Sequence, residues 1–230
     1  MFEDDPENHS LHEPDRPLTF HWRTIDADLI HSLGVPLSRN KDFNAARNSI
    51  LTEAALAHYE QRWVSYSRRK GFYAGLRRYY GTAYTFSTVI PAVEELLRLG
   101  LIEEERSSPG QRGWQSRFRA AVELAEAFAS AEIQYELRGL IRLKDNDRHL
   151  INFSDTPATC RMEREMQHIS AALASIKLDL QAPDVVRTRR HLVVDGAYYR
   201  PTPRPAPYRV FNRGSFKMGG RLFLLCHKRR

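Results

Sequence analysis

The chain has 230 residues, of which 42% are hydrophobic and 10% are aromatic, so a sizeable core argues against disorder throughout. Its formal net charge of +7 favours a polyanionic partner, either nucleic acid or an acidic membrane surface. Two cysteines exclude a disulfide framework and a zinc array, and they fit a reducing compartment.

The sequence predicts no membrane partner. No apolar run approaches the roughly 20 residues that a membrane-spanning helix needs. The N-terminus lacks the basic region and the apolar run of a signal peptide. We therefore expect a cytoplasmic protein.

The charge is distributed unevenly along the chain. Residues 61–120 carry eleven Lys and Arg against five acids, and residues 186–230 carry twelve against one. Residues 1–20 carry six acids and one Arg. We expect the acidic arm, residues 1–17, to be disordered. The alternative is that it lies over a basic surface as a weak competitor.

The first half of the chain predicts helices followed by a hairpin. Apolar positions in residues 42–63 form one stripe, as in a helix. A short helix is expected to end at Gly81, and the next helix, with Thr85 and Ser87 as N-cap candidates, to end at Gly100. An extended segment from Leu101, a turn at 107–110 and a returning strand at 114–120 follow.

The second half predicts a helix at 122–131, a hairpin at 137–153 and a long amphipathic helix at 156–180. The apolar stripe of the long helix includes Met162, Met166 and Ile169. It could pack against the first half or form a dimer face with a second copy of the chain. Residues 186–230 are basic and proline-rich, and we expect an extended, poorly packed tail.

A helix, a turn, a second helix and a two-stranded hairpin make up a winged helix-turn-helix. The sequence thus predicts a mainly α fold with small β hairpins (α+β). A winged helix-turn-helix core lies within residues 18–135, and a hairpin plus the long C-terminal helix follow at 136–185. The basic extended tail, 186–230, completes the chain.

This arrangement predicts binding to double-stranded DNA. Short polar side chains at the start of a recognition helix reach base edges, while surrounding cations neutralise phosphates. The predicted DNA-binding residues are Arg68, Arg69, Lys70, Arg77, Arg78, Thr85, Ser87, Thr88, Arg112, Gln115, Arg117 and Arg119. The alternatives are that the cations are merely solvated, that Thr85 and Ser87 are only helix caps, and that the module mediates protein contacts.

A second basic strip lies near the C-terminus. Arg213, Lys217 and Arg221 recur at four-residue intervals and alternate with Phe211 and Phe216. This spacing predicts a possible phosphate-binding strip. The alternative is a disordered basic tail.

Several segments carry a resemblance to known proteins. They are YTFSTVIPAVEELLRLGLI from Tyr84, PGQRGWQSRFRA from Pro109, RLKDND from Arg142 and YRVFNRGSFKMGGR from Tyr208. Over about residues 45–225 the chain resembles uncharacterised bacterial and mobile-element proteins that are associated with replication and have a winged helix. The resemblance implies DNA binding in replication of a mobile element.

Residues 219–223, GGRLF, resemble the glycine-arginine motif of single-subunit, phage-type RNA polymerases. In longer members of the group, this segment precedes a palm-like region with a catalytic aspartate. Here no Asp or Glu follows Asp195, so the paired carboxylates of two-metal chemistry are missing downstream. We therefore expect a chain that keeps the binding parts and lacks the catalytic part.

No catalytic residue, cofactor or metal site is predicted. Cys160 and His168 are eight residues apart and do not share a helix face as ligands would. The leading hypothesis is a non-enzymatic DNA-binding protein. The alternatives are a truncated or accessory part of a nucleotide-polymerising enzyme and a dimeric transcriptional repressor.

Overall fold

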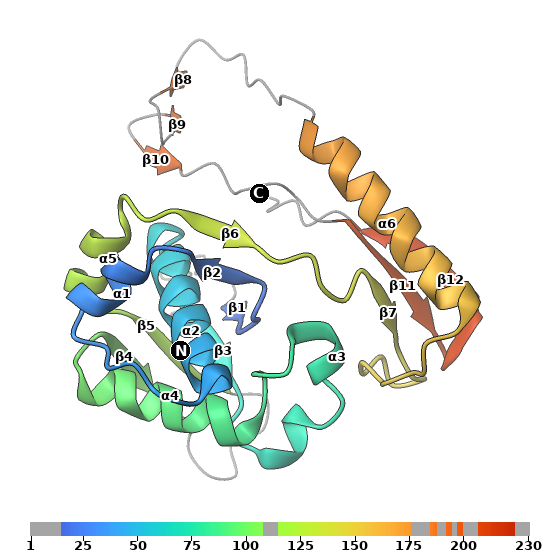
Figure 1. Cartoon of the computed structure of the whole chain (residues 1–230), viewed down its shortest axis with the longest axis horizontal. Helices are drawn as coiled ribbons and strands as arrows, with labels where there is room; N and C mark the ends of the chain where they lie inside the picture. The colour runs from blue at the N-terminus through green and yellow to red at the C-terminus, as the bar shows by residue number, and fades with distance from the viewer. Residues whose placement is uncertain are drawn as a thin grey trace, which may run out of the picture.

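Helix α2 (Lys41–Tyr59) is the centre of the larger of two hydrophobic cores (Figure 1). Ile50, Leu51, Leu56 and the alanines around them are buried, so the helix is covered on most sides. Asn40 caps its N-terminus by accepting a 3.2 Å hydrogen bond from the backbone N–H of Phe43.

A four-stranded sheet packs on α2, with strand order β1-β3-β5-β4. The strands are β1 (Arg16–Pro17), β3 (Val64–Tyr66), β4 (Ile102–Glu105) and β5 (Ser116–Ala120). Strand β5 is antiparallel to both β3 and β4, while β1 pairs in parallel with β3. Val64, Tyr66 and Phe118 are buried, so this sheet belongs to the core.

The remaining elements of this half lie between Trp22 and Tyr135. They are β2 (Trp22–Thr24), α1 (Ala27–Ser32), the 3₁₀ helix η1 (Lys70–Tyr73), α3 (Arg77–Tyr80), α4 (Phe86–Arg98), α5 (Val122–Phe128) and β6 (Ile133–Tyr135). Strands β2 and β6 pair antiparallel. Helices α4 and α5 contact α2 directly.

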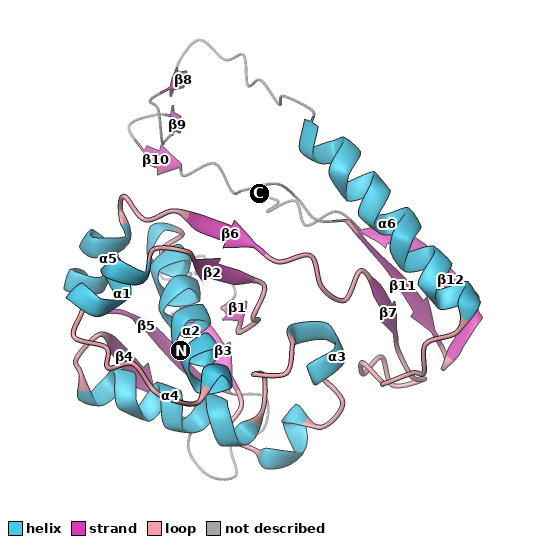
Figure 2. Ribbon diagram, viewed as in Figure 1, coloured by secondary structure: helices cyan, strands magenta, loops and turns pink. Residues whose placement is uncertain are grey.

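The second, smaller core lies beneath helix α6 (Pro157–Ser175), which runs along a three-stranded sheet (Figure 2). The sheet has the order β12-β11-β7, with β7 (Ile141–Leu143), β11 (Tyr208–Asn212) and β12 (Ser215–Phe223). Strand β11 is parallel to β7 and antiparallel to β12. Met166 of α6 is fully buried in this core with Phe211.

This computed structural model describes residues 15–107, 115–175 and 207–223, together with the backbone of three short strands. Those strands, β8 (Val185–Arg187), β9 (Leu192–Val194) and β10 (Ala197–Tyr199), form an antiparallel sheet with β9 in the middle. No helix in the described ranges is both long and apolar enough to span a bilayer.

Tyr79 of α3 holds this helix against β7 and the segments on either side of it. Its side chain is fully buried, and its hydroxyl donates to the carbonyl of Ile151 at 2.5 Å. The backbone N–H of Leu143 in β7 donates to the same hydroxyl at 3.2 Å. Gly139, just before β7, lies directly against the backbone of Tyr79. The position of α3 relative to β7 is therefore fixed by hydrogen bonds and by close packing.

Gly139→Ala is expected to destabilise the protein more than Gly100→Ala. Both glycines have positive φ, +58° and +71°, so either alanine is strained by about 1 kcal/mol or more. Only at Gly139 would the new Cβ also lie 3.0 Å from the Cα of Tyr79, whereas nothing lies within 4 Å at Gly100. Urea unfolding of both variants measures the difference, and equal losses would show that the contact with Tyr79 is not tight.

The predicted fold class is wrong. The chain is α+β, with six α-helices and four sheets in its described part, and it is not mainly α. A winged-helix core is not shown. The expected positioning helix is replaced by η1 and the single turn α3, separated by Gly75 at φ +82°. Strand β5, expected as the edge of a free wing, is instead an inner strand of the core sheet.

Three further expectations differ from the structure. Arg16 and Pro17 were expected in a disordered arm, but they form β1. The basic tail was expected to be poorly packed, yet Val210 and Phe211 are buried in a sheet. The long helix packs by Met166 on its own chain, so this part of its stripe is not an open dimer face. Residues 1–14 and 176–180 lie outside the described residues.

Candidate nucleic-acid interface

The arginines of the β4–β5 hairpin are paired with acids of the same hairpin. Arg117 lies 2.7 Å from Glu105, and Arg119 lies 2.6 Å from Glu103, each directly across the two strands. Both guanidinium groups also lie 4.8 Å from the ring centre of Trp63. These pairs neutralise much of the local charge. Gln115 is exposed, and Arg112 lies outside the described residues.

Arg68 is held in a network with acids of α4 and β4. Its guanidinium lies 2.8 Å from Glu104 and 3.2 Å from Glu94. Burial raises the pKa of Glu104, but hydrogen bonds from Arg68 and Tyr66 outweigh it, so that the pKa is lowered overall. Arg69, Lys70 and Arg77 are exposed, and no ion pair holds them within the described ranges.

Thr85, Ser87 and Thr88 form the N-terminal cap of α4. The backbone N–H of Thr85 donates to the hydroxyl of Thr88 at 3.2 Å, and the hydroxyl groups of Thr85 and Ser87 lie 3.1 Å apart. Thr88 is buried, and its hydroxyl also donates to backbone carbonyls. Capping accounts for these three residues, with only Ser87 exposed.

Arg78 fastens α3 to the segment before α6. It pairs with Asp155, and its guanidinium lies 3.7 Å from the ring centre of Phe153. Asp155, Phe153 and Cys160 line a shallow hollow of about 350 Å³ beside it. Arg78 thus already has an acid and a ring as partners, and its predicted role in DNA binding stays a prediction.

A larger hollow, of about 440 Å³, lies where the β7-β11-β12 sheet meets α3. Four cations and two tyrosines dominate its walls, and no acid is among the lining residues in the described part of the chain. This basic hollow is lined by Tyr80, Arg142, Lys144, Arg148, Leu150, Tyr208, Val210, Asn212 and Arg221. Within the described ranges, none of its four cations takes part in an ion pair.

Strand alternation builds this surface. Along β7, Ile141 and Leu143 are buried in the core under α6, whereas Arg142 lines the hollow. Along β11, Tyr208, Val210 and Asn212 line the hollow, and Phe211 between them lies in the core. The sheet thus has one apolar face, covered by α6, and one basic face that forms the hollow.

The register of the strands places two arginines on either side of Val210. Val210 of β11 pairs with Arg142 of β7 and with Arg221 of β12. The next residue, Phe211, pairs with Gly219, so Gly220 is an extra residue in a β-bulge. Gly219 and Gly220 have φ of +98° and +80°, which only glycine adopts easily.

The three residues of the predicted phosphate-binding strip are not brought together in the basic hollow. Arg221 lines it, whereas Arg213 lies in the β11–β12 turn and Lys217 on β12 before the bulge. The bulge interrupts the regular alternation that would otherwise relate Lys217 to Arg221. The close approach of the two glycines is to β11 itself.

Two contacts hold Arg142 in the wall of the basic hollow. Its guanidinium lies 3.8 Å from the ring centre of Tyr208 and donates to the carbonyl of Gly139 at 3.1 Å. Burial lowers the pKa of His21 to about 3, and the positive charge of Arg142 contributes to the shift. Burial raises the pKa of Tyr80, and Arg142 opposes this. The positive charge of Arg142 therefore acts on two side chains of other elements, His21 and Tyr80.

Arg148 occupies a backbone position that suits glycine. Its φ is +65°, in the left-handed region, which costs a non-glycine residue about 1 kcal/mol or more. Strained residues of this kind cluster at functional sites. Its position in the wall of the basic hollow is consistent with selection of the arginine for its charge.

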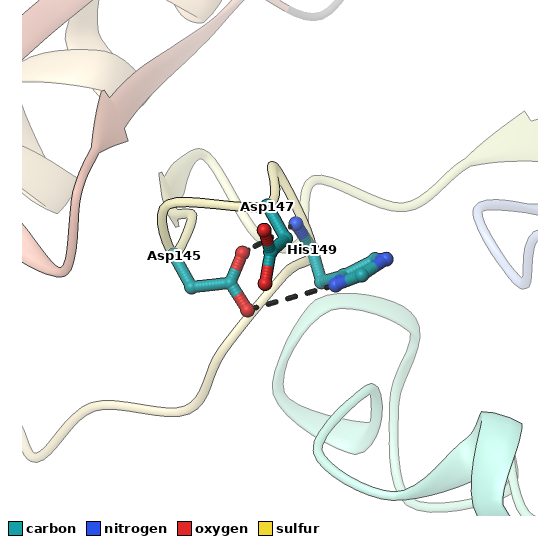
Figure 3. Close-up of side chains that lie close together, drawn as sticks. All are labelled: Asp145, Asp147 and His149. Atoms are coloured by element: carbon teal, nitrogen blue, oxygen red, sulfur yellow. Dashed lines mark hydrogen bonds and ion pairs between the residues drawn. The ribbon is translucent and has the colours of Figure 1, made fainter.

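The same turn contains a small cluster of metal-type side chains, Asp145, Asp147 and His149, whose ligand atoms lie within 4.8 Å of one another (Figure 3). The backbone N–H of His149 donates to the Asp145 carboxylate at 2.8 Å, and His149 Nδ1 lies 3.6 Å from that carboxylate. These contacts of an ordinary polar turn explain the closeness, and the prediction of no metal site stays a prediction.

Sequence reasoning missed Arg142, Lys144, Arg148 and Tyr208 as site residues. The alternation of apolar and basic residues from Ile141 to Lys144 was a usable signal for one basic strand face. Comparison of the chain with protein-family models, with curated proteins and with solved structures finds no match.

Proposed function

We propose that this chain is a nucleic-acid-binding protein and that the basic hollow takes up backbone phosphates. The observation that carries the proposal is the basic face of the β7-β11-β12 sheet, where four cations line one hollow and have no acidic partner in the described part of the chain. Gathering cations costs stability through mutual repulsion unless an anion is bound. A phosphate diester strand supplies such anions at regular spacing.

The basic hollow is a better candidate than the β4–β5 hairpin, because the hairpin arginines already have partners. Arg117 and Arg119 would have to give up ion pairs with Glu105 and Glu103 before contacting phosphate. The arginines of the basic hollow can contact phosphate without giving up an ion pair within the described ranges. A role in replication of a mobile element, and the absence of catalysis, remain part of the proposal through the resemblance described above.

The test is a titration of labelled DNA, single-stranded and duplex, followed by fluorescence anisotropy over a salt series. The wild-type affinity is expected to fall steeply between about 50 and 200 mM salt. Combining Arg148→Gly with Arg221→Ala is expected to weaken binding about tenfold at low salt. Because each lost phosphate contact lowers the salt slope by about one, the slope should fall by about two.

The matched control combines Arg117→Ala with Arg119→Ala, which removes the same charge from the hairpin. We expect a change of about twofold or less, the residual effect of net charge. Arg148→Gly also relieves a positive φ and Arg221 is exposed, so we expect both substitutions to leave the protein folded. If the hairpin variant loses more affinity than the hollow variant, or if wild type binds no DNA, the proposal fails.

A further inference from the structure

We propose that the basic hollow holds one unstacked nucleotide, with its phosphate among the cations and its base on the stacked pair formed by Arg142 and Tyr208. The inference rests on the proposed function and specifies its ligand: DNA or RNA with unpaired bases. It follows from the size of the hollow, its aromatic lining and the pairing of an arginine with a ring.

The size of the hollow suits a single nucleotide. Its volume of about 440 Å³ falls within the range of roughly 300–1,000 Å³ that encloses small ligands. A surface that only tracks duplex phosphates needs no concavity of this size. The hollow is open to solvent on the basic side of the sheet, so a strand could pass over it and insert one residue.

The lining combines both chemistries that a nucleotide requires. Arg142 stacks on Tyr208 with 3.8 Å between the guanidinium carbon and the ring centre, which makes a flat, π-rich surface in the wall. Arginine planes and aromatic rings are the groups on which unpaired bases stack. Arg148 and Arg221 supply charge for the phosphate, and Asn212 supplies an amide for polar contacts.

In a duplex, the bases are stacked on each other and only the phosphates face the protein. Tyr208 would then contribute little, because phosphate contacts depend on the cations alone. With a single strand, stacking of a base on an aromatic side chain adds about 5-fold to 150-fold in affinity for each base. Stacking of a base on the protein therefore contributes to the affinity for a single strand but not to the affinity for a duplex.

The test compares three labelled probes of equal length: a single-stranded thymidine oligonucleotide, an abasic single strand with the same backbone, and a duplex. Wild type is expected to bind the thymidine strand at least about fivefold more tightly than the abasic strand. Tyr208→Leu should remove this advantage by weakening only the thymidine strand. Tyr208→Phe, which keeps the ring, should retain it.

A second measurement needs no substitution. A strand with one 2-aminopurine base should change its fluorescence when it binds wild type, because the base leaves its neighbours in the strand and stacks on the Arg142–Tyr208 pair. The single strand should also bind more tightly than the duplex. Three results would overturn the inference while nucleic-acid binding stands. They are equal affinity for the thymidine and abasic strands, unchanged 2-aminopurine fluorescence, and an equal loss of affinity for both strands in Tyr208→Leu. If none of the probes binds, the proposed function fails with it.

Discussion

Replacing Arg16 with Met is expected to lower the free energy of unfolding by about 3–5 kcal/mol, because it leaves a buried carboxylate without its cation. Arg16 of β1 lies 2.9 Å from Glu53 of α2 and 2.7 Å from Glu60, and its side chain is only 7% exposed. The Glu53 side chain is 1% exposed, and Thr19 also hydrogen-bonds to it. Urea unfolding followed by tryptophan fluorescence measures the loss.

The loss in Arg16→Met should grow as the pH rises. Burial raises the pKa of Glu53 above its ordinary value of 4.5, and the charge of Arg16 opposes that rise. Without Arg16 the folded-state pKa lies higher still. A carboxyl with a raised folded-state pKa contributes stability that is fully present below its unfolded pKa and is lost as the pH rises through the folded pKa. The variant should therefore be closer to wild type at about pH 5 than at about pH 8.

Arg23→Met is the matched control for this prediction. Arg23 lies 2.8 Å from Glu136, but its side chain is 50% exposed. An exposed pair contributes less than about 1 kcal/mol, and its loss should show little dependence on pH. Equal losses in the two variants, or a loss in Arg16→Met that shrinks with rising pH, would show that the Glu53 carboxylate is not held as the structure has it.

Met166→Glu is expected to destabilise the smaller core by on the order of 3–5 kcal/mol, because it removes a packed side chain and buries a carboxylate. Met166 is fully buried among Leu140, Ile141, Leu143 and Phe211. Urea unfolding followed by circular dichroism measures the loss, and sedimentation measures the molecular mass.

Ile169→Glu on the same helix provides the control. Ile169 is 38% exposed, so the substitution should cost less than about 1 kcal/mol. The dimeric-repressor hypothesis gives a different result. In that case Met166→Glu would stay folded and would halve the molecular mass, and the packing of α6 on its own sheet would be refuted.

Local signals in the sequence predicted the longer helices well, because helix ends depend on nearby residues. The helix expected at 42–63 is α2 (Lys41–Tyr59), and it ends early because Gln61 adopts a φ of +54°. The expected stop at Gly100 coincides with its φ of +71°. The hairpin expected at 101–120 is present as β4 and β5.

The fold class was predicted wrongly, and most of the cations of the basic hollow were missed, for a shared reason: pairing between distant strands leaves no periodic signal. Strand β1 pairs with β3, and β7 pairs with β11, across long stretches of chain. The site was therefore predicted from cations that are close in sequence, and several of these form ion pairs with acids in the structure. Arg221 was predicted, but its neighbours in the basic hollow come from β7 and from the turn after it.

The parallel pairing of β7 with β11 has a consequence for the order of folding during synthesis. Every buried residue of the larger core precedes Leu140, so that half can close while the rest of the chain is still being translated. The sheet that contains Leu140, Ile141 and Leu143 cannot be completed until Phe211 has been synthesised. Until then their apolar side chains and an unpaired strand edge are available to a chaperone or to another nascent chain.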